Sequence, residues 1–487
     1  MAKGIPQIKI PLKAKGLTID EVKPYLDYVF SIFKENAENI RRDYDMYCLN
    51  HPILGKTRTH DDTDVNNIVL IPNLKSIIDW KTGYVFGNPI KYAQNKSSET
   101  DDIEYLNKYV RSACQRAVDK EVGKWAYATG VGYYFTEPKS EDYDVESEAP
   151  YEIFCRESDT CTKVYSSYNG NKPLFDLLYT KYDKIDENKL KKTVDVLDIY
   201  LPNTLYTFEK NDNGVWDIVE EQERGLYRKL PLTEKRANKD GIGIVAMGST
   251  LQQAMDMLIS NGLDNVEDIV NEVWIYYNVV LGDNPAEQSK MHRSMKKGGA
   301  IQVNTNDPQK QPKVDTITPK LSLSEIRELF NIVNYMFHST VGVPMEMSNT
   351  NSGNTTKQGS EVANGYDNAY NRALDDINTF IEADTELLDK IMWICKNDKG
   401  NKIDNLSTSE IEIKYCINLT DNIQTKAQAY GTLIQTMPAT MALRICRLSN
   451  DPEAEGRQIE ENMRKKNKEN VSRETNAQQN DTNGESL

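Results

Sequence analysis

The sequence is poor in the residues and motifs that mark enzymes. It has only four histidines, and no H-E-x-x-H pair occurs among them. It also lacks the G-x-x-x-x-G-K-[ST] loop that cradles nucleotide phosphates, and Gly241, Gly243 and Gly248 do not have the dinucleotide-binding spacing. No serine, threonine or carboxylate stands in a pattern typical of an activated nucleophile. We therefore predict a protein that is not an enzyme, with no catalytic residue, metal site or cofactor.

Neither the cysteines nor the apolar runs of the sequence indicate a zinc or redox site, membrane insertion or export. The seven cysteines are scattered, and the spacing of Cys155 and Cys161 fits no zinc or redox pattern. We expect reduced thiols in a cytosolic setting. No apolar run reaches the roughly 18 residues of a membrane helix, and residues 1–17 lack a signal-peptide core. Neither membrane insertion nor export is expected.

The sequence has fewer basic than acidic side chains. The chain carries 74 acidic and 59 basic side chains, a formal net charge of -15. Proteins that grip the phosphate backbone tightly are usually basic, which argues against a stand-alone nucleic-acid binder. An acidic chain can still surround DNA if its task is to let DNA slide. The mean hydropathy of -0.65 is typical of a soluble protein.

One histidine-bearing segment invites a metal-site interpretation. His51 and His60 lie near Asp61, Asp62 and Asp64. No two of these residues are fixed on one helical face, so a solvated loop over residues 51–67 is the favoured interpretation.

The first half of the chain predicts an α+β fold. Residues 20–47 and 101–130 have helical periodicity, whereas residues 133–219 contain short β-rich runs divided by Asn/Asp/Gly turns. The second pattern is typical of an antiparallel meander.

The middle of the chain predicts two long helices around a small insert. Residues 251–281 and 321–340 are periodic, with a break in the first near Asn261 and Gly262. The insert carries a basic patch and predicted strands at 300–304 and 314–317. The basic residues are Lys290, Arg293, Lys296 and Lys297. This patch either docks an acidic partner or forms a solvated face.

A polar loop and a very long helix follow. Residues 341–359 are rich in Asn, Ser and Thr, and an apolar stripe then runs from 361 to 395, about 50 Å of helix. The loop is either a linker or a contact for a polymer threading past. Similarly, the apolar stripe of residues 321–340 either fills the core or forms a subunit interface. After residue 465 the sequence is polar and predicts a disordered tail.

Four passages, in this order, resemble the portal proteins of tailed bacteriophages, in particular the siphophage-type branch. They are residues 73–79 with 83–90, residues 126–133, Val343-Pro344 with 351–353 and the long helix, and residues 436–438 with 450–453. Together they span about residues 66–463.

The resemblance implies a ring-forming portal architecture with defined parts. Residues 1–250 would be the wing, 251–282 and 320–340 the two-helix stem, and 283–319 a clip with a small β-hairpin. The remaining parts would be a tunnel loop (341–358), a long wing helix (359–397), a helical crown (398–464) and a disordered tail (465–487). The DNA-facing loop residues would be Met345, Ser348, Asn349, Asn351, Asn354 and Lys357, and the partner-docking clip residues would be Lys290, Arg293, Lys296 and Lys297.

The resemblance also implies a role in the virion. About a dozen subunits would form a head–tail connector ring at one capsid vertex, the channel for packaging and ejection of double-stranded DNA without sequence specificity. Its partners would be the large terminase subunit, a head-completion adaptor, and the scaffolding and major capsid proteins, with assembly in the host cytoplasm. The alternatives are an adaptor or connector virion protein that does not thread DNA, and a DNA-processing enzyme, which the missing motifs disfavour.

Overall fold

The computed structural model describes most of the chain, which divides into two compact units. The described residues are 4–57, 66–94, 101–139, 143–168, 170–185, 191–211, 213–225, 227–270, 273–277, 284–287, 289–290, 309, 313–317, 323–343, 355–398, 403, 405–417, 423–446, 448–449 and 455–465. The first unit comprises residues 1–44, 76–246 and 367–487, and the second comprises 45–75 and 247–366.

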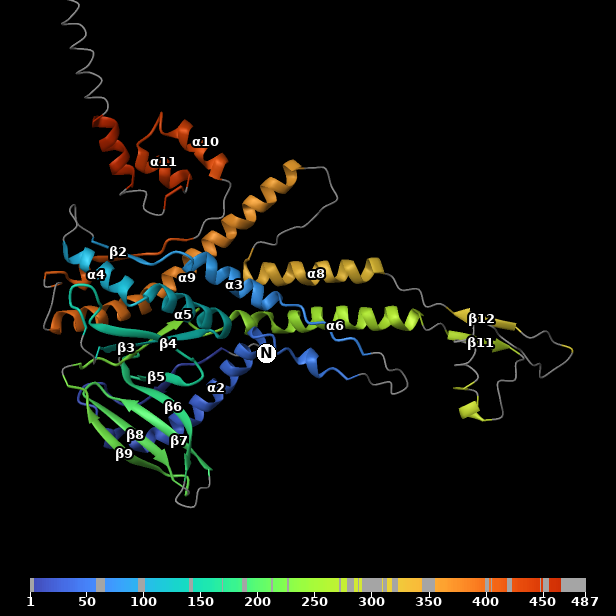
Figure 1. The fold of residues 1–487 in the computed structure, drawn as a ribbon, viewed down its shortest axis with the longest axis horizontal. Coiled ribbons are helices and arrows are strands. Elements are labelled where there is room, and N and C mark those ends of the chain that lie inside the picture. The colour runs from blue at the N-terminus through green and yellow to red at the C-terminus, as the bar shows by residue number, and fades with distance from the viewer. Residues whose placement is uncertain are drawn as a thin grey trace, which may run out of the picture. The chain divides into compact units, whose positions relative to one another are not determined.

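The first unit contains a six-stranded sheet with the order β1-β5-β6-β7-β8-β9 (Figure 1). Its strands are β1 (Ile8–Ile10), β5 (Cys161–Ser166), β6 (Pro173–Ile185), β7 (Lys191–Tyr200), β8 (Thr204–Lys210) and β9 (Trp216–Glu223). Strands β5 to β9 pair antiparallel in chain order, which confirms the predicted meander for residues 161–219, whereas the strands between residues 133 and 156 belong to another sheet. Strand β1 joins β5 in parallel at the other edge.

One face of this sheet is covered by the N-terminal helices. They are α1 (Ile19–Val22), the 3-10 turn η1 (Lys23–Tyr25) and α2 (Leu26–Tyr47). The apolar stripe of α2, including Phe30 and Phe33, packs on Phe175 and Leu197 of the sheet. The predicted helix over residues 20–47 is confirmed, with a 3-10 interruption at Pro24.

A second sheet, ordered β10-β3-β4, and a two-stranded sheet of β13 and β2 complete the strands of this unit. The strands are β2 (Lys91–Gln94), β3 (Val131–Pro138), β4 (Tyr151–Arg156), β10 (Leu232–Arg236) and β13 (Ile411–Lys414). The helices are α3 (Asn73–Phe86), α4 (Asp101–Ser112), α5 (Gln115–Thr129), the C-terminal part of α9 (Thr355–Asn397), α10 (Ile423–Leu433) and α11 (Ala439–Cys446). The 3-10 turn η3 (Thr408–Glu410) precedes β13, and residues 455–465 form a further helical stretch.

Buried charges hold α9 inside this unit. Lys235 Nζ lies 2.7 Å from Asp384 Oδ1, and both side chains are almost fully buried. The rings of Phe86, Tyr134, Phe380 and Tyr415 surround this ammonium group, with centroids 5.0–5.6 Å away. Tyr134 also donates a hydrogen bond to the buried Asp119 of α5 (3.0 Å). One buried lysine thus faces two buried carboxyl groups.

The second unit is built on α6 (Ile244–Val270) and α8 (Leu323–Val341). It also contains the 3-10 turn η2 (Pro52–Gly55) and the antiparallel strands β11 (Val273–Tyr277) and β12 (Lys313–Ile317). The chain therefore mixes helices and sheets, in agreement with the predicted α+β class.

The predicted first long helix, 251–281, is wrong at its C-terminal end. The α-helix ends at Val270, and residues 273–277 form β11 instead. Val-Trp-Ile-Tyr-Tyr is rich in β-branched and aromatic residues, which favour a strand once a partner strand is available. That partner is β12, and the predicted strand 300–304 lies outside the described residues.

Candidate functional site

Helices α6 and α8 lie side by side and run antiparallel (Figure 1). At one end Gly248 of α6 accommodates Phe337 of α8, because a Cβ atom there would lie only 2.7 Å from its ring. At the other end Gly262 faces Ile326, at 3.8–3.9 Å from the corresponding Cβ position. The predicted break at Asn261 and Gly262 is wrong, since α6 continues through both residues to Val270. A glycine inside a helix costs only about 1 kcal/mol, which tertiary packing can offset.

A ladder of buried polar side chains on α6 binds an extended segment of the chain. The ladder residues Gln252, Asp256, Ser260 and Asp264 are spaced by one helical turn and therefore share a face. They accept hydrogen bonds from main-chain N–H groups: Asp264 from Asn67 (2.7 Å), Ser260 from Val69 (3.0 Å), Asp256 from Ile71 (2.9 Å) and Gln252 from Leu74 (3.2 Å). Asn67, Val69 and Ile71 are alternate residues of the extended segment, so their N–H groups point the same way and match the helical spacing of their partners. Leu74 instead donates from the first turn of α3.

His51 and Lys56 attach the preceding segment to the same ladder. His51 Nδ1 lies 2.7 Å from Asp256 Oδ2, with both side chains fully buried, and Lys56 donates to Asp264 (2.7 Å). Burial alone would raise the pKa of Asp264, but hydrogen bonds from Lys56 and Asn67 outweigh it and lower that pKa below its ordinary value. His51 is thus part of a packed unit, and the prediction that it lies in a solvated loop is wrong. His60 and residues 61–64 lie outside the described part of the chain.

Helix α8 exposes an apolar stripe beside the face that it buries. Phe337 is fully buried, whereas Leu329, Ile332, Tyr335 and Met336 are 49%, 49%, 63% and 52% exposed in the single chain. These four residues define the α8 stripe. A helix that is apolar over such a wide arc usually buries most of its surface against several partners. The predicted stripe on this helix therefore divides into a core face and an uncovered face.

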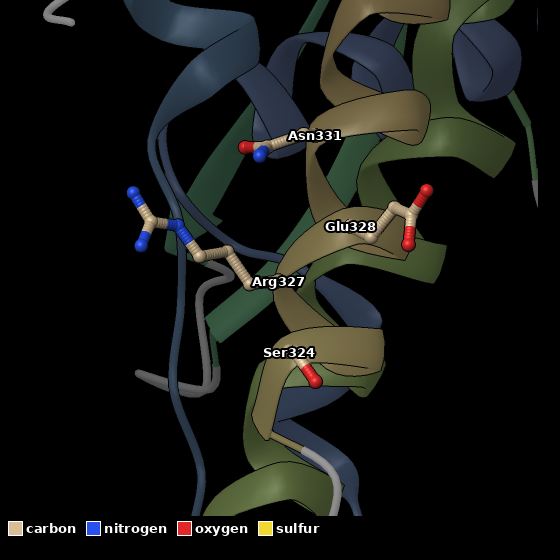
Figure 2. A pocket seen from close by; sticks show the side chains of 4 residues that line it. All are labelled: Ser324, Arg327, Glu328 and Asn331. Carbon is tan, nitrogen blue, oxygen red and sulfur yellow. The ribbon is translucent and has the colours of Figure 1, made fainter. Parts of the chain in front are cut away.

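A shallow hollow of about 440 Å³ lies beside the N-terminal half of α8. It is lined by Ser324, Arg327, Glu328 and Asn331. Figure 2 shows that Arg327 and Asn331 point to one side of the helix and Glu328 to the other, so the side chains do not converge on a common point. The hollow is a groove along a polar helix surface and not an enclosed ligand site.

The predicted clip residues are described only in part. Lys290 is exposed and, like residues 285–287 and 289, is helical. Arg293, Lys296 and Lys297 lie outside the described residues. The docking role of this basic patch therefore stays a prediction.

The predicted DNA-facing residues also fall largely outside the described chain. These are Met345, Ser348, Asn349, Asn351 and Asn354. Lys357 is placed: α9 begins at Thr355, so Lys357 lies in the first turn of the helix and not in the loop. The loop was predicted to end near Gly359, but a long amphipathic helix can extend through one glycine at modest cost.

The amino-acid sequence of the chain matches a known family. The sequence model of the family described as "Phage portal protein, SPP1 Gp6-like" matches residues 26–469. The chain belongs to this family. The expected resemblance to bacteriophage portal proteins is therefore confirmed over most of the sequence.

One curated relative is the portal protein of Bacillus phage SPP1. It is 23% identical over 278 residues, an alignment that covers 53% of this chain and 52% of that protein. The chain thus matches about half the length of this portal protein. Within the described part of the chain, no helix is long and apolar enough to cross a membrane, and no group of three or more His, Cys, Asp or Glu side chains is placed to hold a metal ion.

Proposed function

We propose that the chain assembles into a ring at one capsid vertex and forms the channel through which phage DNA is packaged and later ejected. Membership of the SPP1-like portal family over residues 26–469 is the observation that carries this proposal. The α8 stripe supports it, because four large apolar side chains are left uncovered on a long helix of the single chain. Burial of this stripe against a second copy would stabilise a ring by removing apolar surface from water.

In this ring, residues 1–250 form the wing, and α6 with α8 forms the stem between residues 251 and 340. Residues 283–319 form the clip, and the β11–β12 pair stands where stem helix and clip join. Residues 341–354 form the tunnel loop, shorter than the sequence predicts because α9 begins at Thr355. Residues 398–464 form the crown.

The clip lysines and Arg293 dock the large terminase subunit during packaging and a head-completion adaptor afterwards. The scaffolding and major capsid proteins contact the ring at the vertex, where it resides in the virion after assembly in the host cytoplasm. The ring itself is structural, and the chemistry that drives packaging belongs to the terminase.

DNA passes without sequence specificity. A formal charge of -15 favours a weak grip on the phosphate backbone, since long-range repulsion opposes tight binding. The loop residues Asn349, Asn351 and Asn354 offer hydrogen bonds to a moving polymer with little charge. An adaptor that does not thread DNA is the competing function.

A loop deletion separates the two functions. We expect removal of residues 349–354 to leave ring assembly intact while DNA packaging falls by about tenfold or more, measured as nuclease-protected DNA in assembled heads. The deletion spares Thr355, where α9 begins. Removal of residues 472–477 from the C-terminal tail is the matched control and should package as the unaltered chain does. Normal packaging by the loop deletion would favour the adaptor.

A further inference from the structure

The free edge formed by β9 in the six-stranded sheet is acidic. Strand β9 pairs with β8 on one side and has no other strand partner among the described residues (Figure 1). It carries the exposed carboxylates of Asp217, Glu220, Glu221 and Glu223. The neighbouring Arg224 does not neutralise them at the surface, because its side chain is only 7% exposed, lies 3.8 Å from Glu137 and donates to the main-chain oxygens of Leu201 and Lys229.

The opposite edge of the same sheet is basic. Strand β1 pairs with β5 and, in the described part of the chain, with no second strand. Lys9 is exposed between the buried Ile8 and Ile10, and Lys13 and Lys15 are exposed in the segment that follows β1. The nearest acidic residues in sequence are engaged elsewhere, since Asp20 pairs with Lys23 (3.2 Å) and Glu21 accepts the main-chain N–H of Thr18 (3.1 Å).

The acidic edge also exposes apolar side chains. Val215 and Val219 are 56% and 55% exposed, and Ile218 is exposed beside them. An edge strand that is only protected against unwanted pairing needs charge alone. Charge together with exposed apolar side chains is instead typical of the rim and centre of a contact surface.

From these two edges we propose that the β9 edge of one copy docks on the β1 edge of the next copy in the ring. This inference rests on the proposed ring and names which surfaces of its sheets meet. A two-fold contact of like edges would oppose acid to acid or lysine to lysine, which is unfavourable. The opposite charges therefore favour a head-to-tail contact, and head-to-tail contacts repeated around an axis close into a ring.

Charge reversal and rescue test this contact in the full-length chain. We expect Glu220→Lys with Glu223→Lys to lower the fraction of chains in rings by about tenfold at low salt, because lysines would then face lysines. The variant Lys13→Glu with Lys15→Glu should fail similarly. Combining all four substitutions should restore rings, since each contact regains opposite charges. Glu104→Lys with Glu121→Lys, at exposed positions of α4 and α5, is the matched control and should assemble normally.

A second measurement does not depend on any variant folding. Carbodiimide joins carboxylates to amines at contact distance, so rings made from mixed isotope-labelled and unlabelled chains should give intermolecular links between Glu220 or Glu223 and Lys9, Lys13 or Lys15. Rings that form without these links, and that tolerate the reversals, would overturn the edge contact and leave the proposed ring standing. Links from the acidic edge to another protein in place of a second copy would also overturn it. Failure of the unaltered chain to associate under any condition would overturn both proposals.

Discussion

At the scale of single residues, one cluster of buried charges in the first unit is unbalanced. Asp119 and Asp384 lie in one cluster with a single cation, Lys235. Burial raises the pKa of Asp119 to about 7, with Asp384 acting in the same direction and Lys235 opposing it. The folded chain therefore binds a proton at Asp119 that the unfolded chain releases near pH 4.

This proton makes stability depend on pH. Between about pH 4 and 7 the folded state holds more protons than the unfolded state at this site, so the contribution of Asp119 to stability falls as pH rises. Asp119→Asn mimics the protonated carboxyl group, so its stability relative to the unaltered chain should rise over that range and level off above pH 7. Thermal unfolding at several pH values measures the difference. The control Glu104→Gln, at an exposed site on α4, should follow the unaltered chain, and parallel pH profiles for Asp119→Asn would refute the assignment.

The burial of some single residues, such as His51, could not be predicted from the sequence. His51 stands in a polar stretch of the sequence, which suggests a solvated loop. It is nevertheless buried, because its ring Nδ1 pairs with Asp256, a residue distant in sequence, at 2.7 Å. A repeat of polar residues every fourth position in α6 was the available signal, but periodicity does not reveal which segment such residues bind.

At the scale of elements, helices and meander strands followed local patterns and were predictable. The exceptions have tertiary causes. Strand β11 needs β12 beside it to hold residues 273–277 extended, and α6 continues through Gly262, where it faces Ile326 of α8. Helix α9 also begins at Thr355, before Gly359, although glycine has a low helix propensity. The pairing of α6 with α8 could be expected from the order of the elements, whereas the uncovered half of α8 could not.

The α8 stripe gives a prediction for this element. Ile332→Glu places a charge at a site that is exposed in the single chain, so folding should be unchanged. If the stripe is buried between copies, desolvation of that charge should reduce ring formation by about tenfold or more. Size-exclusion chromatography with light scattering measures the change. Asn331→Glu introduces the same charge at the adjacent polar position and should assemble normally; equal behaviour of the two variants would remove the stripe from the interface.

At the scale of the whole molecule, function could be predicted only through the resemblance to portal proteins. Composition and missing motifs argued against an enzyme, but no single residue indicated a DNA channel. The family match over residues 26–469 supplies that link, while the loop and clip residues predicted to act lie mostly outside the described chain. The surfaces that the structure adds are the α8 stripe and the two oppositely charged sheet edges.

The native mass of the purified full-length chain, measured by light scattering with electron micrographs of the same peak, tests the ring most directly. We expect a particle of roughly 670 kDa, about a dozen copies of the 55.6 kDa chain, with a central hole. A monomer or compact dimer that forms no ring, even when produced together with the phage scaffolding and capsid proteins, would contradict the proposed portal function.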